Sequence, residues 1–269
     1  MTLNQKQTKG KKKMGPIILG IVAVIIVIAI IAVSNIGGNN VKAMNDAVDT
    51  VLTKLNENFT VTPVDVGDYK EMKIYGIMKF DVEQYEIEEI GNLSIMRMNA
   101  LGLMQMSTLV ITPKDKNLPL LSTDYMYILS NRKSYVEIYD LSAKKDEAYN
   151  QLLTNLSDAL KKYNHLEDVA TSETWYSDLL GASAYKAGKS ADDADMKSML
   201  TDTIDVYIAH AKQLPLLTEE EKAEKLAITL EYTNGLVEKG GVSTDVFKKE
   251  LGEEETKKFF DNIFFGTAK

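Results

Sequence analysis

The sequence predicts an α+β domain preceded by one N-terminal transmembrane helix, and three observations support this fold class. An uncharged apolar run occupies residues 16–33, alternating apolar residues follow from Met72 to Asp140, and helical periodicity returns after Leu141. A sheet followed by helices is typical of a domain whose helices pack on the faces of an antiparallel sheet. No internal repeat or change of composition divides the remaining chain, which favours a single domain.

The run PIILGIVAVIIVIAIIAV is long enough to cross a bilayer. About 20 apolar residues, at roughly 1.5 Å of rise each, span a hydrocarbon core that is roughly 30 Å thick. A cleaved signal peptide is the alternative, because residues 41–43 resemble a cleavage site, but the apolar cores of signal peptides are only about 7–15 residues long. We therefore expect a basic tail at residues 1–14 and a membrane anchor at residues 15–36.

The distribution of charge predicts an orientation and excludes some partners. Five lysines lie in residues 1–14, whereas only Lys42 and Lys54 lie within about 20 residues after the run, so the positive-inside rule predicts a cytoplasmic N-terminus. The main domain is then extracytoplasmic on a single-pass protein of the cell membrane. That domain has 26 basic and 39 acidic residues, a formal charge of −13, which argues against nucleic-acid binding.

The spacing of apolar residues places the first elements. Residues 41–60 have a three-four spacing, which predicts a juxtamembrane helix that packs on its own domain. In the alternating block that follows, the period of two predicts half-buried strands. Breaks at residues 91–92, 113–117 and 131–133 divide this block into roughly six strands, for which a meander is the simplest topology.

Four helical segments are expected after the strands. Their apolar periodicity runs from Tyr149 to Tyr163, from about Asp192 to Gln213, from Thr218 to Val237 and from Ser243 to the end. In the third segment, Thr218 and Glu221 have the spacing of a capping box, which marks the start of a helix.

The common catalytic and metal-binding signatures are absent from the sequence. There is no phosphate-binding glycine loop, no G-x-S-x-G elbow and no H-E-x-x-H motif, and the chain has no cysteine. Its two histidines, His165 and His210, are too few for a histidine metal cluster, so we predict no metal site. Candidate residues therefore have to be chosen by their position.

Asp124 is the first candidate, because it lies at the start of an otherwise apolar and aromatic strand. Residues 118–121 before it are LPLL, and residues 125–129 after it are YMYIL. A carboxylate in such surroundings either caps a turn at the strand entrance or is a proton donor whose pKa is raised by burial. The pattern alone favours the turn-capping role.

Four segments carry a resemblance to a known family: ITPKDKNLPLLSTD, which ends at Asp124, YVEIYDLS at residues 135–142, FKKELGEEE at residues 247–255 and FFDNIFF at residues 259–265. They resemble the ferredoxin-dependent bilin reductases, which reduce biliverdin-type linear tetrapyrroles. That family has an LP pair before an aspartate, a strand ending in DLSP, an FGEEWA segment and a final FLF. The resemblance covers residues 70–266.

This resemblance implies an α/β/α sandwich at residues 68–269, with a central antiparallel sheet between helices and the bilin between the sheet and the C-terminal helices. It implies no tightly bound cofactor, since electrons arrive singly from an external donor such as ferredoxin. Ferredoxin is cytoplasmic, whereas the lysines place this domain outside. Either another electron-donor protein serves the domain, or the fold has been reused for binding.

The resemblance also implies roles for individual residues. Asp124 falls on the family's catalytic aspartate, which protonates the bilin. Asp205 is similar to a second acid of some members, with a solvated helix position as the alternative, and Ser107 stands where one branch has a catalytic histidine. Trp175 matches a tryptophan near the family's pocket, although it could equally belong to the core. Ala170 stands where an arginine is expected to pair with a bilin propionate.

We therefore expect a membrane-anchored, bilin-reductase-like protein that reduces or binds a linear tetrapyrrole or a similar conjugated ligand. Asp124 is its expected proton donor, with Asp205 or Ser107 assisting. The alternative is a non-catalytic extracytoplasmic module that binds a ligand or a protein on the same fold, favoured by the replaced arginine and histidine. A purely structural envelope protein is a third hypothesis, and a cavity containing Asp124 would count against it.

Overall fold

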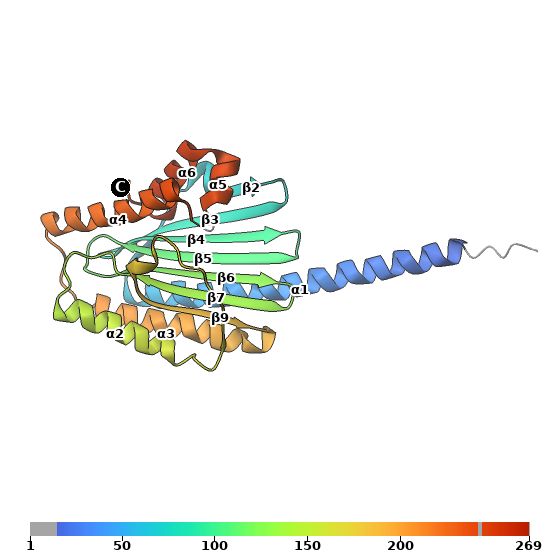
Figure 1. Ribbon diagram of the computed structural model, residues 1–269, viewed down its shortest axis with the longest axis horizontal. Helices are drawn as coiled ribbons and strands as arrows, with labels where there is room; N and C mark the ends of the chain where they lie inside the picture. The colour runs from blue at the N-terminus through green and yellow to red at the C-terminus, as the bar shows by residue number, and fades with distance from the viewer. Residues whose placement is uncertain (1–14, 242–243, 269) are drawn as a thin grey trace, which may run out of the picture.

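The computed structural model describes residues 15–241 and 244–268, with side chains described from residue 31 onward in those ranges. These residues form a nine-stranded antiparallel sheet between two layers of helices (Figure 1). The strand order is β1-β3-β4-β5-β6-β7-β9-β8, and β2 also pairs with β3. The expected mixed fold with a central antiparallel sheet is therefore confirmed.

The strands are β1 (Val61–Val64), β2 (Glu71–Ile74), β3 (Met78–Ile87), β4 (Gly91–Ala100), β5 (Met104–Pro113), β6 (Leu120–Ile128), β7 (Asn131–Tyr139), β8 (Glu167–Asp168) and β9 (Leu180–Gly188). The α-helices are α1 (Gly15–Asn58), α2 (Glu147–Lys161), α3 (Asp193–Ala211), α4 (Glu219–Lys239), α5 (Thr244–Leu251) and α6 (Glu253–Phe259). Short helical turns are η1 (Gly67–Lys70), η2 (Ser177–Leu179), η3 (Ser190–Asp192) and the π-helical η4 (Phe260–Phe264).

Strands β2 to β7 form the six-stranded meander that the alternating residues predicted. The predicted break at residues 113–117 falls between β5 and β6, but the other two are displaced, because Gly91 and Asn131 are the first residues of β4 and β7. The chain turns before them, where Glu89 and Leu129 have φ values of 62° and 52°. Residues other than glycine rarely adopt positive φ. The sequence therefore does not mark Glu89 and Leu129 as turn residues, and both turns were predicted one or two residues too late, at the nearby glycine and asparagine.

Three strands lie outside the predicted meander. Strands β1 and β8 are only 4 and 2 residues long, and β9 is rich in glycine and alanine, which are depleted in strands. At Gly181 in β9, a Cβ atom would lie 3.0 Å from the Leu153 side chain of α2. The small residues of β9 therefore let α2 pack closely on the sheet.

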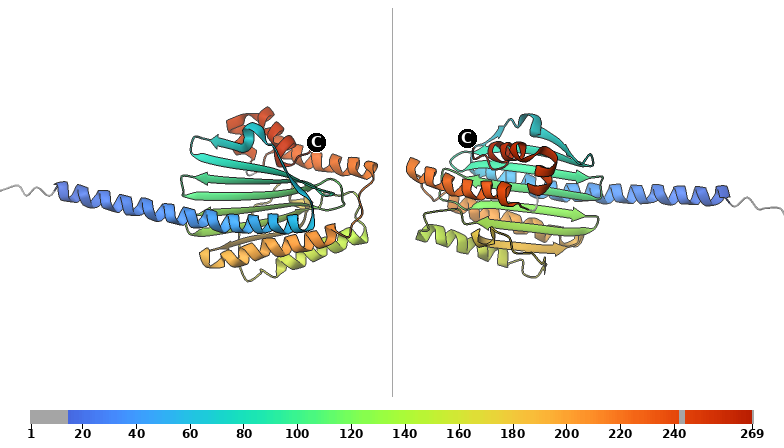
Figure 2. Two further views of the ribbon diagram at one scale, coloured as in Figure 1. Left: turned by 180° about the vertical axis from the view of Figure 1, so that it is seen from behind. Right: turned by 45° about the horizontal axis from the view of Figure 1, so that its top comes forward.

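Helices α1, α2 and α3 cover one face of the sheet, as Figure 2 shows from behind. The predicted apolar stripes of α1 and α3 are buried in the core on this face: Met44, Val48, Val51, Leu55, Met196, Leu200, Ile204, Tyr207 and Ala211. Because the second half of α1 and strand β1 belong to this packed unit, the sandwich begins before the expected boundary at residue 68.

The opposite face is covered by α4, α5, α6 and η4. Thr218 and Glu221 form the predicted capping box, in which Glu221 N donates to Thr218 Oγ1 at 3.2 Å and Thr218 N donates to Glu221 Oε2 at 2.9 Å. A second core on this face is rich in aromatic side chains: Tyr139, Tyr232, Phe247, Phe259, Phe260 and Phe265. The candidate site lies in this layer.

Helix α1 continues without interruption through the two glycines and two asparagines at residues 37–40. Its first half projects beyond the sheet (Figure 1). The basic tail expected at residues 1–14 lies outside the described residues, as do most side chains of the anchor expected at residues 15–36. Within the described part of the chain, no helix has the combination of length and hydropathy needed to cross a bilayer.

Candidate functional site

A cavity of about 690 Å³ lies between the sheet and the C-terminal helices. Its floor is formed by side chains of β4 to β7 and β9 that point away from α1, and its roof by residues of α4, α5 and η4. The loop before β9, at residues 169–179, forms one wall. Small-molecule sites in proteins have volumes of roughly 300–1,000 Å³, so this cavity is large enough to hold a ligand.

Asp124 lies on the cavity floor, in the middle of β6. Its register partner on β5, Thr108, donates a hydrogen bond from Oγ1 to Asp124 Oδ1. Burial raises the pKa of Asp124 to about 6, the Thr108 hydrogen bond opposes this rise, and the nearby Glu137 adds to it. Asp124 is therefore within a strand rather than at a turn, and its carboxyl exchanges a proton close to neutral pH.

Glu137 on β7 is a second carboxyl in the cavity lining. It accepts hydrogen bonds from the hydroxyls of Tyr139 at 2.8 Å and Tyr185 at 2.9 Å. Burial raises the pKa of Glu137, and these two hydrogen bonds limit the rise. Sequence reasoning missed Glu137. The usable signal is its alternation with Tyr135 and Tyr139, which puts all three side chains on one face of the strand that follows Asp124.

The remaining lining is largely aromatic and apolar. Met96, Met106 and Met126 contribute thioethers from three adjacent strands. Above them, the ring of Tyr232 on α4 lies 4.7 Å from that of Tyr139, measured between centroids, and Phe264 also lines the roof. Aromatic rings and polarisable sulfur atoms pack well on flat conjugated molecules.

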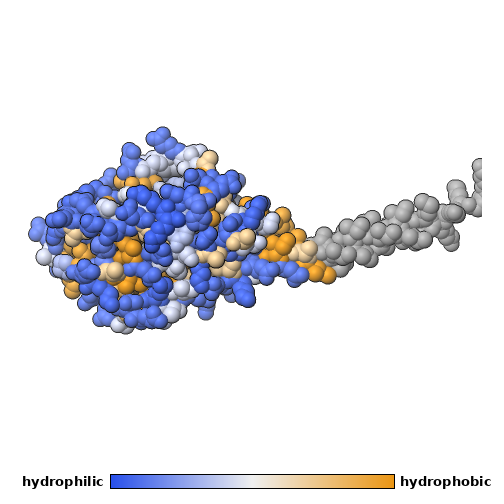
Figure 3. Space-filling view, turned by 90° about the horizontal axis from the view of Figure 1, so that it is seen from below, coloured by the Kyte–Doolittle hydropathy of each residue, from blue (hydrophilic) through white to orange (hydrophobic). Residues whose placement is uncertain are grey.

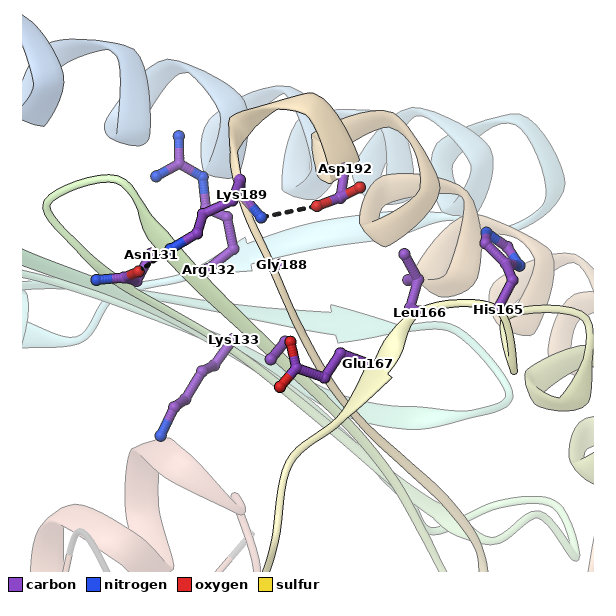
Figure 4. Close-up of a pocket in the computed structure, with 10 residues that line it drawn as sticks. Asn131, Arg132, Lys133, His165, Leu166, Glu167, Gly188, Lys189 and Asp192 are labelled. Atoms are coloured by element: carbon purple, nitrogen blue, oxygen red, sulfur yellow. Dashed lines mark hydrogen bonds between the residues drawn. The ribbon is translucent and has the colours of Figure 1, made fainter.

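Lys133 is the one cationic side chain among the described residues that line the cavity. It forms no ion pair within the described part of the chain. Figure 4 shows its ammonium group pointing away from Arg132 and Lys189 and toward the C-terminal helices. Ala170, where the family resemblance leads us to expect an arginine, also lines the cavity. Lys133 is thus the group available to bind a ligand carboxylate.

Two of the expected catalytic residues are not in the cavity. Ser107 is next to Thr108 on β5, so its side chain points to the opposite face, where it is buried beside the α1 layer. Asp205 lies on α3, on that same far side of the sheet, where it accepts from Lys54 Nζ at 2.7 Å and is 54% exposed. The expectation that either residue assists Asp124 is corrected, because the sheet separates them from its carboxyl.

Trp175 lies beside the cavity, and its neighbours Thr174 and Tyr176 belong to the lining. Its indole Nε1 donates to the carbonyl of Gly240 at 2.9 Å. The ring packs so closely on α4 that a Cβ atom at Gly235 would lie 2.4 Å from it. Trp175 therefore fixes the wall loop to α4, and its expected contact with a substrate stays a prediction.

A second hollow, of about 470 Å³, lies at the β7 and β9 end of the sheet (Figure 4). Its polar side chains largely pair with one another or with nearby residues. Arg132 donates to Asp193 at 2.8 Å, Lys189 N donates to Asp192 at 2.7 Å, and His165 contacts Asp195 at 3.1 Å. Groups satisfied in this way stabilise the local fold, so the cavity containing Asp124 is the better candidate. Within the described residues, no three histidine or carboxylate side chains converge as a metal-ligand set.

No family model and no curated protein matches the sequence. Among solved structures, the chain is similar to phytochromobilin synthase from tomato, which was solved in complex with biliverdin. The TM-score is 0.68 at 15% sequence identity, and the match covers 83% of this chain and 83% of that chain. The chain therefore has the mixed helix and antiparallel-sheet fold of that bilin reductase, as the resemblance in sequence implied.

Proposed function

We propose that this chain is a membrane-anchored, bilin-reductase-like protein that binds a linear tetrapyrrole or a similar conjugated ligand and reduces it. The observation that carries this proposal is Asp124, a carboxyl with a pKa of about 6 that faces a large, aromatic cavity. The fold shared with phytochromobilin synthase supports the class of ligand. A carboxyl kept partly protonated near neutral pH is suited to general acid catalysis.

In this proposal the protein positions the ligand and delivers protons, and the electrons come from outside. Reduction of one double bond of the conjugated system requires two electrons and two protons. An external one-electron donor, ferredoxin-like or of another kind, supplies the electrons singly. Asp124 transfers its proton to the reduced ligand, becomes a carboxylate, and is reprotonated from the bulk solvent before the second transfer. No tightly bound cofactor is required.

Lys133 has a binding role in the same proposal. A tetrapyrrole propionate is a carboxylate, and an ammonium group without another partner attracts it across the cavity. Lys133 in this way replaces the arginine expected at Ala170. The lysine asymmetry of the sequence supports a reaction outside the cytoplasm, and the proposal therefore includes an extracytoplasmic electron donor.

A non-catalytic binding module is the second candidate function. This candidate is supported by Ser107 and Asp205, which lie across the sheet from the cavity. Asp124 is then the one expected catalytic residue that lines the cavity. Such a module holds the conjugated ligand or a protein partner without reducing it. The cavity around Asp124 favours either function over a structural protein with a dry, packed interface.

The deciding experiment uses the full chain in lipid nanodiscs, titrated with biliverdin and followed by its visible absorption. The complex is then given a chemical one-electron reductant without oxygen. We expect a changed spectrum on binding and stepwise bleaching on reduction. Asp124→Asn should bind the ligand and bleach far more slowly, whereas the matched control Asp205→Asn should behave as the wild type.

Each result has a distinct meaning. Binding without Asp124-dependent bleaching would overturn the reductase and favour the binding module. No spectral change at saturating biliverdin would overturn both functions for this ligand class.

A further inference from the structure

Exposed apolar side chains are gathered at one end of the domain. Among the side chains that the structure describes, eight large apolar ones are exposed, and of these Leu216 lies at the opposite end of the sheet from the rest. The other seven are Ile31, Tyr75, Ile77, Leu101, Leu103, Ile128 and Leu129. Six of these lie at the turns β2–β3, β4–β5 and β6–β7, which we call the hairpin tips (residues 75–77, 101–103 and 128–130).

The three hairpin tips lie at the same end of the sheet, because alternate turns of a meander return to the same side. The second and third tips are joined by a hydrogen bond from Leu129 N to Leu103 O at 3.0 Å. Figure 1 shows that α1 projects from this same end. Figure 3 shows apolar surface gathered where α1 leaves the domain. The second and third tips and the projecting helix therefore form one apolar region, and the first tip lies at the same end of the sheet.

The hairpin tips contain residues that their backbone geometry disfavours. Tyr75 and Leu101 have φ values of 51° and 53°, and the glycine that follows each has a positive φ as well. Turns with positive φ at two successive residues prefer asparagine, aspartate or glycine at the first of them. Leu129 also has a positive φ, at 52°, although a serine follows it in place of a glycine. An exposed leucine in this conformation destabilises the fold, so folding alone does not explain these residues.

The structure also places the tips relative to the predicted anchor. Asn40 on α1 donates from Nδ2 to the carbonyl of Leu129 at 2.9 Å. Gly37 approaches the second tip so closely that a Cβ atom there would lie 2.7 Å from Gly102 O. The apolar run at residues 16–33 ends roughly 6 Å before Gly37 along the helix. A bilayer crossed by that run has its surface at the level of the hairpin tips.

We propose that the hairpin tips insert into the surface of the lipid bilayer that holds α1, so that the domain sits directly on the membrane. Tyrosine is suited to the interface between headgroups and acyl chains, and leucine and isoleucine to the apolar side of that boundary. The Lys249 ammonium lies 5.9 Å from the ring centroid of Tyr75, where it can also contact headgroup phosphates. This membrane contact rests on the membrane anchor of the proposed function and is independent of the reaction proposed for the cavity.

The absence of cysteine from the chain allows a direct test. Leu101→Cys and Leu129→Cys are labelled with a fluorophore in the full chain, which is reconstituted into vesicles of phosphatidylcholine and phosphatidylglycerol. Leu216→Cys is the matched control, because it replaces an exposed leucine at the other end of the sheet. Quenching is measured with nitroxides attached to lipid and with iodide in the water, on variants that melt at the wild-type temperature.

We expect lipid nitroxides to quench the labels at residues 101 and 129 several-fold more strongly than the label at 216, with the reverse order for iodide. Equal iodide quenching at all three positions would overturn the proposal. Shielding of the tips from both quenchers would show that a second copy of the chain covers them, which also overturns it. Failure of the full chain to float with the vesicles would overturn the membrane anchor of the proposed function and, with it, this contact, whereas flotation with iodide-quenched tips would overturn the contact alone.

Discussion

Thr108 donates a hydrogen bond to Asp124 from the adjacent strand, and this bond opposes the rise that burial causes in the pKa of the cavity carboxyl. Burial raises the pKa of Asp124, the Thr108 hydroxyl opposes that effect by stabilising the carboxylate, and Glu137 adds to the rise through its negative charge. Two neighbours on opposite sides of Asp124 therefore act on its pKa in opposite directions.

Thr108→Val should raise the pKa of Asp124 above its value of about 6, because the carboxylate loses a hydrogen-bond donor. Glu137→Gln should lower it, because a neighbouring charge is removed. The measurement is a pH titration of the carboxyl stretch by infrared difference spectroscopy, which requires no turnover. Thr108→Ser keeps the hydroxyl and serves as the control. Shifts of the same sign in both variants would contradict the assigned causes.

Asp124→Asn should stabilise the protein at alkaline pH and leave it unchanged in acid. The folded pKa of about 6 lies above the unfolded value of about 3.9, so the native state holds this proton more tightly. That contribution to stability is complete below pH 4 and is lost as the pH rises through 6. The variant should gain up to about 3 kcal/mol in free energy of unfolding at pH 8, measured by urea denaturation. Asp205→Asn, at an exposed site, should show no such pH-dependent gain.

Lys133→Ala should weaken binding of biliverdin about tenfold or more, since a hydrogen bond to a charged group contributes roughly 1.5–3 kcal/mol. Biliverdin dimethyl ester, which lacks the carboxylates, should bind the variant and the wild type equally. Spectroscopic titration measures both constants. Lys161→Ala, on the exposed surface of α2, is the matched control. An equal loss for acid and ester would show that Lys133 acts by packing rather than by charge.

Replacing each of the two adjacent glycines of α1 by alanine should change the free energy of unfolding in opposite directions. At Gly37 a Cβ atom would lie 2.7 Å from the Gly102 carbonyl, whereas at Gly38 it meets nothing within 4 Å. Gly37→Ala should therefore lower the free energy of unfolding by about 1–3 kcal/mol, as overpacking does. Gly38→Ala should raise it by about 0.5–1 kcal/mol through helix propensity. Thermal melts of both variants check the contact between α1 and the second hairpin tip.

Leu101→Asn should stabilise the domain while weakening its contact with lipid. Asparagine tolerates the positive φ of 53° at this position better than leucine does, which favours the variant by about 1 kcal/mol. A higher melting temperature of the full chain in detergent micelles, together with weaker quenching by lipid nitroxides in vesicles, is the expected result. A lower melting temperature would show that Leu101 is needed for folding.

Much of the fold follows from local patterns in the sequence. Alternation predicted the meander from β2 to β7, and the stripes through Met44 and Ile204 predicted the buried faces of α1 and α3, because burial on one face imposes the period of the element. The Thr218 capping box is equally local. Strand β9 was not predicted, because glycine and alanine do not favour strands locally. These small residues instead allow α2, which is separated from β9 in the sequence, to pack closely on the sheet.

The candidate site, like the fold, was predicted from the sequence only in part. The sequence by itself determined that Asp124 lies among apolar and aromatic residues, and its resemblance to bilin reductases suggested the role. Only the tertiary structure decided that Glu137 and Lys133 share its cavity while Ser107 and Asp205 lie across the sheet. A strand's side-chain direction reverses at every residue, and a helix can pack on either face, so the pairing of β5, β6 and β7 and the layer chosen by α3 fix which groups meet.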